Sequence, residues 1–233
     1  MDGLTEGFCW YFVFLFSVTV HEAAHAWAAK LGGDLTAYYG GQVSIDPMPH
    51  IRREPLGMVA LPIFSVLVSG WPLGFASTPY DPAWAHRYPR RAAWMALAGP
   101  AANLALVVFA AILIHVGIWL GYWHSPESAW LASVTVGTQP GVWSVAAMLV
   151  SMLFSLNLIL AVLNMIPLPP LDGSGALALL LSEEAADRYQ SFLFSQPMLG
   201  WFGIVIAWKA FRPIFGPIFT LALNLLYPGL GYA

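Results

Sequence analysis

Near its start the chain reads FCWYFVFLFSVTVHEAAHAWAA, from Phe8 to Ala29. This 22-residue run is apolar and long enough to cross the hydrocarbon core of a bilayer as a helix. Three ionisable residues interrupt it: His21, Glu22 and His25. An ionisable side chain inside a membrane segment costs roughly 2–3 kcal/mol or more without a partner. The run therefore predicts a membrane helix that carries a polar site.

The composition of the whole chain agrees with a membrane location. Of 233 residues, 59% are hydrophobic and 9% are charged, the mean hydropathy is +0.69 and the formal net charge is −3. Such a chain lacks the charged surface that a soluble globule needs. The same composition also excludes a disordered chain and a nucleic-acid-binding protein. A disulfide scaffold is excluded because the only cysteine is Cys9. The apolar runs are continuous, so we expect an all-α polytopic membrane protein, a helical transmembrane bundle.

Five further apolar stretches follow the first. They are Leu56–Phe75, Ala92–Tyr122, Val142–Ile166, Phe192–Trp208 and Ile214–Tyr227. The acidic residues Asp2 and Glu6 stand where a signal peptide would be basic, so we expect the first helix to remain in the mature protein.

The stretch Leu56–Phe75 is broken by two prolines and two glycines, which predicts a re-entrant segment rather than a full crossing. The basic residues on either side of it then lie on one face of the membrane, which the positive-inside rule assigns to the cytosol. A full crossing, the alternative, would divide them. These residues are Lys30, Arg52, Arg53, Arg87, Arg90, Arg91 and Arg188.

The segment Thr36–Ile45 mixes β-branched and aromatic residues around Gly40 and Gly41. This pattern predicts a small membrane-associated β-hairpin, with a plain loop as the alternative.

The motif HEAAH at residues 21–25 has a chemical interpretation. On a helix His21 and His25 share one face, and two imidazoles so placed can bind one Zn²⁺. Glu22 would lie close to the metal-bound water and act on it as a general base. The alternative is three polar residues packed in a helix by chance, which the energetic cost of burying them in a membrane disfavours.

A catalytic zinc needs a third protein ligand. Asp172 is the only other acidic residue within an apolar context, and it follows the proline-rich sequence NMIPLPPL that begins at Asn164. The prolines interrupt the preceding helix and make room for a polar pocket. Asp172 would complete a site of two histidines and one aspartate that holds one Zn²⁺ per chain. The alternative is that Asp172 caps the short helix that follows.

Three motifs occur in a fixed order: HEAAH at 21–25, GPAAN at 99–103 and NMIPLPPLDG at 164–173. Together they resemble the site-2 protease family of intramembrane zinc metalloproteases, in its short branch without PDZ or CBS domains. The resemblance implies that His21, His25 and Asp172 bind the zinc and that Glu22 is the catalytic base. It implies one intramembrane metalloprotease domain over residues 1–233, with a catalytic core at about 8–182 and C-terminal helices at about 190–228.

The resemblance also implies where substrate binds. Asn164 would help to bind or position it, and Asn103 would line the same core, unless its amide only bonds across helices. The strand edge formed by residues 40–45 would pair with an extended substrate. From that edge we select Gly41, Gln42 and Val43. One departure is visible, because Ser77 and Thr78 follow Phe75 and Ala76 where members of this branch often have a basic residue.

We therefore expect a multi-pass zinc endopeptidase of the cell membrane with its active site toward the cytosol. Its partners would be the lipid bilayer and membrane-protein substrates that contain a transmembrane helix, with hydrolysis in or near that helix. Two alternatives remain open: a membrane metallohydrolase that acts on a non-peptide substrate, and a non-catalytic, metal-dependent membrane scaffold or transporter. A transporter is expected to show two related halves, and the sequence shows no internal repeat.

Overall fold

A computed structural model of the protein describes residues 3–196 and 198–233. Its elements are α1 (Gly3–Gly32), α2 (Thr36–Tyr39), α3 (Pro47–Arg53), the π-helix η1 (Leu56–Ala60), α4 (Leu61–Ser69), α5 (Pro82–Arg87), α6 (Pro89–Trp119), β1 (Trp123–His124), β2 (Val136–Gly137), α7 (Val142–Asn164), α8 (Asp172–Ala176), the 3₁₀ helix η2 (Leu177–Leu180), α9 (Glu183–Ser195) and α10 (Met198–Leu226).

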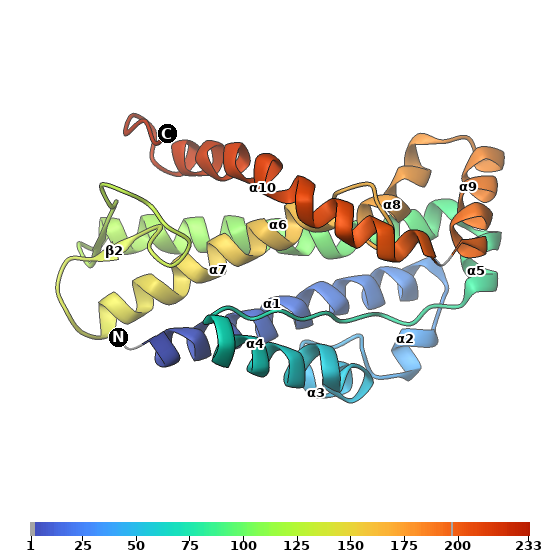
Figure 1. Cartoon of the computed structure of the whole chain (residues 1–233), viewed down its shortest axis with the longest axis horizontal. Coiled ribbons are helices and arrows are strands. Elements are labelled where there is room, and N and C mark those ends of the chain that lie inside the picture. Colours follow the sequence, from blue (N-terminus) through green and yellow to red (C-terminus); the bar gives the residue numbers. More distant parts are fainter. Residues whose placement is uncertain (1–2, 197) are drawn as a thin grey trace.

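Four helices, α1, α6, α7 and α10, are long and apolar enough to cross a membrane, so the protein is multi-pass. They lie roughly along one axis, with α6 packed against both α1 and α7, and α10 along the outside (Figure 1). The expected fold class is confirmed: the described chain is mostly helical and has one small two-stranded antiparallel sheet, β1 with β2.

The position predicted for the hairpin is wrong. Thr36–Tyr39 forms the short helix α2, and a turn follows in which Gly41 has a φ of +75°. The cause is Asp34, whose carboxylate accepts hydrogen bonds from both the backbone N–H and the hydroxyl of Thr36. Such a side-chain turn starts a helical turn and overrides the β propensity of the aromatic residues. The small sheet instead lies at the opposite end of the bundle (Figure 1).

The C-terminal part also differs from expectation. The two apolar stretches predicted at 192–208 and 214–227 belong largely to one helix, α10, which contains Pro213 and Pro217. Prolines are tolerated within membrane helices when neighbouring groups satisfy the freed backbone. Before it, α9 is a separate polar helix that begins where the Ser182 hydroxyl accepts a hydrogen bond from the N–H of Ala185.

The segment predicted to be re-entrant folds as η1 and α4 and then returns in extended form. We call residues 71–80 the return segment. It runs alongside α1 and delivers the chain to α5, near the end at which the excursion began (Figure 1). Its backbone is fixed to the excursion by hydrogen bonds from Leu73 N to Ser65 Oγ (2.7 Å) and from Phe75 N to Gly57 O (3.1 Å).

Apolar packing holds this excursion against the bundle. Trp10 and Phe14 of α1, Met58 of η1, and Met152 and Leu156 of α7 form one buried cluster. Met58 and Met152 are fully buried, so η1 is anchored between two of the long helices. Within a membrane such contacts stabilise the fold through van der Waals packing, because lipid is as apolar as these side chains.

The return of the chain predicts which loops share a side of the membrane. We expect single cysteines made by Arg52→Cys and Arg87→Cys, in a Cys9→Ala background, to react with a membrane-impermeant thiol reagent from the same side. The matched control is Glu127→Cys in the loop between β1 and β2, which should react from the opposite side. Reaction of positions 52 and 87 from opposite sides would contradict the re-entrant path.

Candidate metal centre

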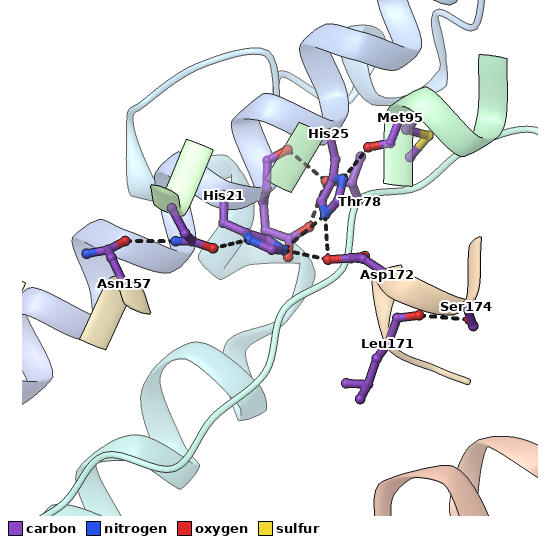
Figure 2. Close-up of polar contacts among 10 residues, drawn as sticks. His21, His25, Thr78, Met95, Asn157, Leu171, Asp172 and Ser174 are labelled. Carbon is purple, nitrogen blue, oxygen red and sulfur yellow. Dashed lines mark hydrogen bonds and ion pairs between the residues drawn. The ribbon is translucent and has the colours of Figure 1, made fainter. Parts of the chain in front are cut away.

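Side chains from two distant parts of the sequence meet in the bundle. His21 and His25 lie on one face of α1, and Asp172 is the first residue of α8. The two Nε2 atoms are 3.0 Å apart, and Asp172 Oδ2 lies 3.1 Å from His21 Nε2 and 3.3 Å from His25 Nε2. Figure 2 shows the three side chains pointing toward one another. They form a group that could hold a metal ion.

Two glycines allow close packing around the site, one between α6 and α1 and one between α8 and the end of α7. A Cβ on Gly99 of α6 would overlap the imidazole rings of His21 and His25. A Cβ on Gly173 would collide with the carbonyl groups of Met165 and Ile166, where α7 ends. Both glycines belong to motifs recognised in the sequence, GPAAN and LDG. Because they have no side chain, the backbone at Gly99 can contact the imidazole rings and the backbone at Gly173 can contact the end of α7.

The carboxylate of Asp172 is free to face the histidines. The residue at the N-terminal cap of α8 is Leu171, and no side chain caps the first N–H groups of this helix. The alternative that Asp172 caps its own helix is thus not what the structure shows. Its Oδ2 atom is buried and has no hydrogen-bond donor among the described residues.

The tautomer of His25 follows from its partner. Its Nδ1 lies 2.7 Å from the backbone carbonyl oxygen of Met95 in α6. A carbonyl oxygen can only accept, so Nδ1 carries the proton and donates it. The Nε2 atom of His25 then presents a lone pair to the site.

A chain of amides fixes the tautomer of His21 in the same way. Asn157 of α7 uses its Nδ2 to donate to the Leu153 carbonyl (2.8 Å) and to the Ser17 hydroxyl (2.9 Å), which sets its amide orientation. Its Oδ1 therefore faces Asn103 and accepts from Nδ2 at 2.8 Å. The Oδ1 of Asn103 in turn lies 2.6 Å from His21 Nδ1, which must donate.

When both imidazole rings are neutral, the two Nε2 atoms and the carboxylate oxygen opposite them present lone pairs to one another with no proton between them. Such a group repels itself in a buried place unless a cation lies among its members. Two imidazole nitrogens and one carboxylate oxygen are a ligand set typical of catalytic zinc, in which a fourth position stays open. The residues present therefore fit Zn²⁺.

Glu22 adjoins this centre without belonging to the converging group. It is 5% exposed, and its Oε2 accepts a hydrogen bond of 2.7 Å from the Thr78 hydroxyl of the return segment. Glu22, His25 and Asp172 line one cavity of about 450 Å³, together with Ala76, Ser77, Thr78 and residues of α6, α8 and α9. The site thus places a carboxylate beside the three converging side chains and opens both onto the same space.

The residues predicted to bind substrate lie in different places. Asn103 is fully buried and contacts His21 rather than the cavity. Asn164 is the last residue of α7, half-buried, and is absent from the described lining of the cavity. Gln42 is buried and donates a long hydrogen bond (3.4 Å) to the Ser77 carbonyl, while Gly41 and Val43 lie in the turn beside it.

Sequence reasoning missed Asn157 and Thr78. Asn157 lies inside the apolar stretch 142–166, so the criterion that selected Glu22, a polar group at membrane depth, could have selected it as well. Thr78 was noted only as part of a departure from the family's pattern, and a single threonine before Pro79 does not indicate a contact with Glu22.

The hydrogen bond from His21 to Asn103 predicts an effect on zinc affinity. We expect Asn103→Leu to weaken zinc binding about 10–100-fold, because His21 loses the acceptor that fixes its tautomer. Asp172→Ala, which removes a ligand, should weaken it more. Glu127→Ala, an exposed acid at the far end, is the control and should leave affinity unchanged. Competition with a chelator measures all three, and equal affinity in Asn103→Leu and the wild type would contradict the assignment.

Comparison with known proteins agrees with the site. Residues 10–199 match peptidase family M50. Over 161 residues the chain is 32% identical to a Bacillus subtilis protein described as "Putative zinc metalloprotease YwhC", covering 67% of this chain and 62% of that protein. Over 212 residues it is 28% identical to "Putative zinc metalloprotease Rip2" of Mycobacterium tuberculosis, covering 83% and 70%. No solved structure matches significantly. The chain therefore belongs to peptidase family M50, the site-2 protease family that its motifs resemble.

Proposed function

We propose that this protein is an intramembrane zinc endopeptidase that hydrolyses peptide bonds in or near the transmembrane helices of other membrane proteins. One observation carries the proposal: His21, His25 and Asp172 direct two imidazole nitrogens and a carboxylate oxygen to one point, and Glu22 opens onto the same cavity. Membership of family M50 and the four long apolar helices support it.

The zinc would supply a Lewis acid that polarises the scissile carbonyl and increases the acidity of the attacking water. Glu22 accepts a proton from that water as the water's oxygen bonds to the carbonyl carbon. When the bond between carbon and nitrogen breaks, Glu22 returns the same proton to the leaving nitrogen. One water is consumed, and the carboxylate ends as it began.

The return segment offers a place for the substrate backbone. Its odd-numbered residues bond to the protein through Leu73 N, Phe75 N and Ser77 O. Ala76 and Thr78 are the even-numbered residues on either side of Ser77. Their backbone N–H and C=O groups make no hydrogen bond within the described chain. In extended backbone, alternate residues direct these groups to opposite sides. The segment therefore has a free edge, and residues 76–78 line the cavity.

A free strand edge suits an unwound substrate. Peptide bonds in a helix are shielded by their own hydrogen bonds, so a transmembrane helix must unwind locally before water can attack it. An extended peptide can replace the lost bonds by pairing with an exposed edge. We propose that residues 76–78 take the role that the sequence had suggested for Gly41, Gln42 and Val43, with Gln42 supporting the segment from behind.

We also propose that the site faces the cytosol. Five of the nine basic residues lie on α5 and α9 and on the adjoining ends of α1 and α6, whereas β1 and β2 lie at the other end (Figure 1). Two more, Arg52 and Arg53, lie on α3, nearer the middle of the bundle. The positive-inside rule assigns the first end to the cytosol. From Lys30 to His21 is about 13 Å along a helix, at 1.5 Å per residue. This depth lies short of the midplane of a core about 30 Å thick.

Glu22→Gln tests the proposed activity. We expect the purified variant to bind zinc like the wild type, because Glu22 is not a ligand, and to lose at least about 100-fold in the cleavage of a single-span membrane protein. Elemental analysis and gel-based cleavage measure the two properties together. A parallel panel of lipids tests the non-peptide alternative. Full turnover of the protein substrate by Glu22→Gln would show that Glu22 is not the general base. Hydrolysis of lipid but not of protein by the wild type would show that the substrate is not a peptide.

Pairing with the return segment predicts a two-residue period in substrate tolerance. A single N-methyl group, moved residue by residue along the cleaved segment of a synthetic substrate, removes one N–H at a time. Cleavage should fall at alternate positions, because only alternate N–H groups of a strand face its partner. Uniform sensitivity, or sensitivity repeating every three to four residues, would show that the substrate does not bind as a strand.

A further inference from the structure

We infer that Thr78 is a positioning residue that orients the carboxylate of Glu22 for proton transfer. The inference rests on the proposed role of Glu22 as the general base. It adds a second element to that role, because Thr78 belongs to the return segment and not to the helix that carries the HEAAH motif.

The Thr78 hydroxyl lies between two oxygens of the same glutamate. Its Oγ1 is 2.7 Å from Glu22 Oε2 and 2.9 Å from the backbone carbonyl oxygen of Glu22. A hydroxyl has one proton, so it donates to one of them at a time. The ionised carboxylate is the stronger acceptor and is the nearer atom, as expected for a charge-assisted hydrogen bond. This bond favours one orientation of the Glu22 side chain.

The position of Thr78 is set independently of Glu22. On one side, the Ser77 carbonyl accepts hydrogen bonds from Arg53 Nε (3.1 Å) and Gln42 Nε2 (3.4 Å). On the other side, Asp81 N donates to Asp34 Oδ2 at 2.8 Å. The backbone is thus held before and after Thr78. The position of the hydroxyl therefore does not depend on the position of the Glu22 carboxylate.

The same residue also belongs to the free edge proposed for the substrate. Thr78 lines the cavity, and its side chain binds Glu22. A peptide paired with this edge would therefore be placed relative to the base by a single residue. Errors in that placement are costly, since a displacement of about 1 Å can lower a rate about 100-fold.

The test compares three substitutions in the purified full chain. Thr78→Val keeps the branched shape and removes the hydroxyl, and it should lower kcat about 10–100-fold with KM within about twofold of wild type. Thr78→Ser restores the hydroxyl and should recover kcat to within about threefold. Thr138→Val, in the loop next to β2, is the matched control and should behave as wild type.

Three further readouts separate positioning from structure. Zinc content and thermal unfolding should be the same in Thr78→Val and wild type. In a Glu22→Asp background, whose shorter carboxylate no longer reaches the hydroxyl, adding Thr78→Val should change kcat less than about threefold, because coupled residues are not additive.

Several results would overturn the inference: wild-type kcat in Thr78→Val, equal losses in Thr78→Val and Thr78→Ser, or a loss accompanied by loss of zinc or by unfolding. If Glu22→Gln is inactive while Thr78→Val has full kcat, the inference fails and the proposed function stands. If Glu22→Gln also keeps full turnover, the proposed function itself fails.

Discussion

The structure depends on the orientation of two imidazole rings inside an apolar bundle. Each Nδ1 of His21 and His25 donates to an oxygen supplied by α6, so in the neutral rings each Nε2 presents a lone pair to Asp172. A membrane interior offers little water to compensate such a group, and the cost of leaving it unsatisfied is several kcal/mol. A bound cation removes that cost. Residues of α1, α6, α7 and α8 all contribute to this one place.

The sequence predicted the centre because its members are ionisable side chains within apolar segments. His21, Glu22 and Asp172 stand in apolar surroundings, where spacing and cost alone indicate a site. The supporting contacts are harder to read, since Met95 contributes through its carbonyl and Gly99 through the absence of a side chain. Neither leaves a polar signal in the sequence, although the glycine stood within a recognised motif.

The predictions that failed concern local structure near Gly40 and the C-terminal helices. Thr36–Ile45 has the residues of a strand, yet the Asp34 side chain starts a helical turn before any strand partner is available. The extended element lies instead at residues 71–80, where proline and glycine were taken as breaks in a membrane segment. Its extended form comes from contacts with Ser65, Gly57 and Gln42, which are distant in sequence and leave no local pattern.

The amide chain that orients His21 ends on the carbonyl of Leu153. That oxygen belongs to the backbone of α7, and every residue type placed at position 153 except one that breaks the helix would supply it. The direction of three successive hydrogen bonds is thus encoded by main chain, beyond the reach of ordinary side-chain substitution there. Position 153 can therefore change to suit packing without altering which nitrogen of His21 carries the proton.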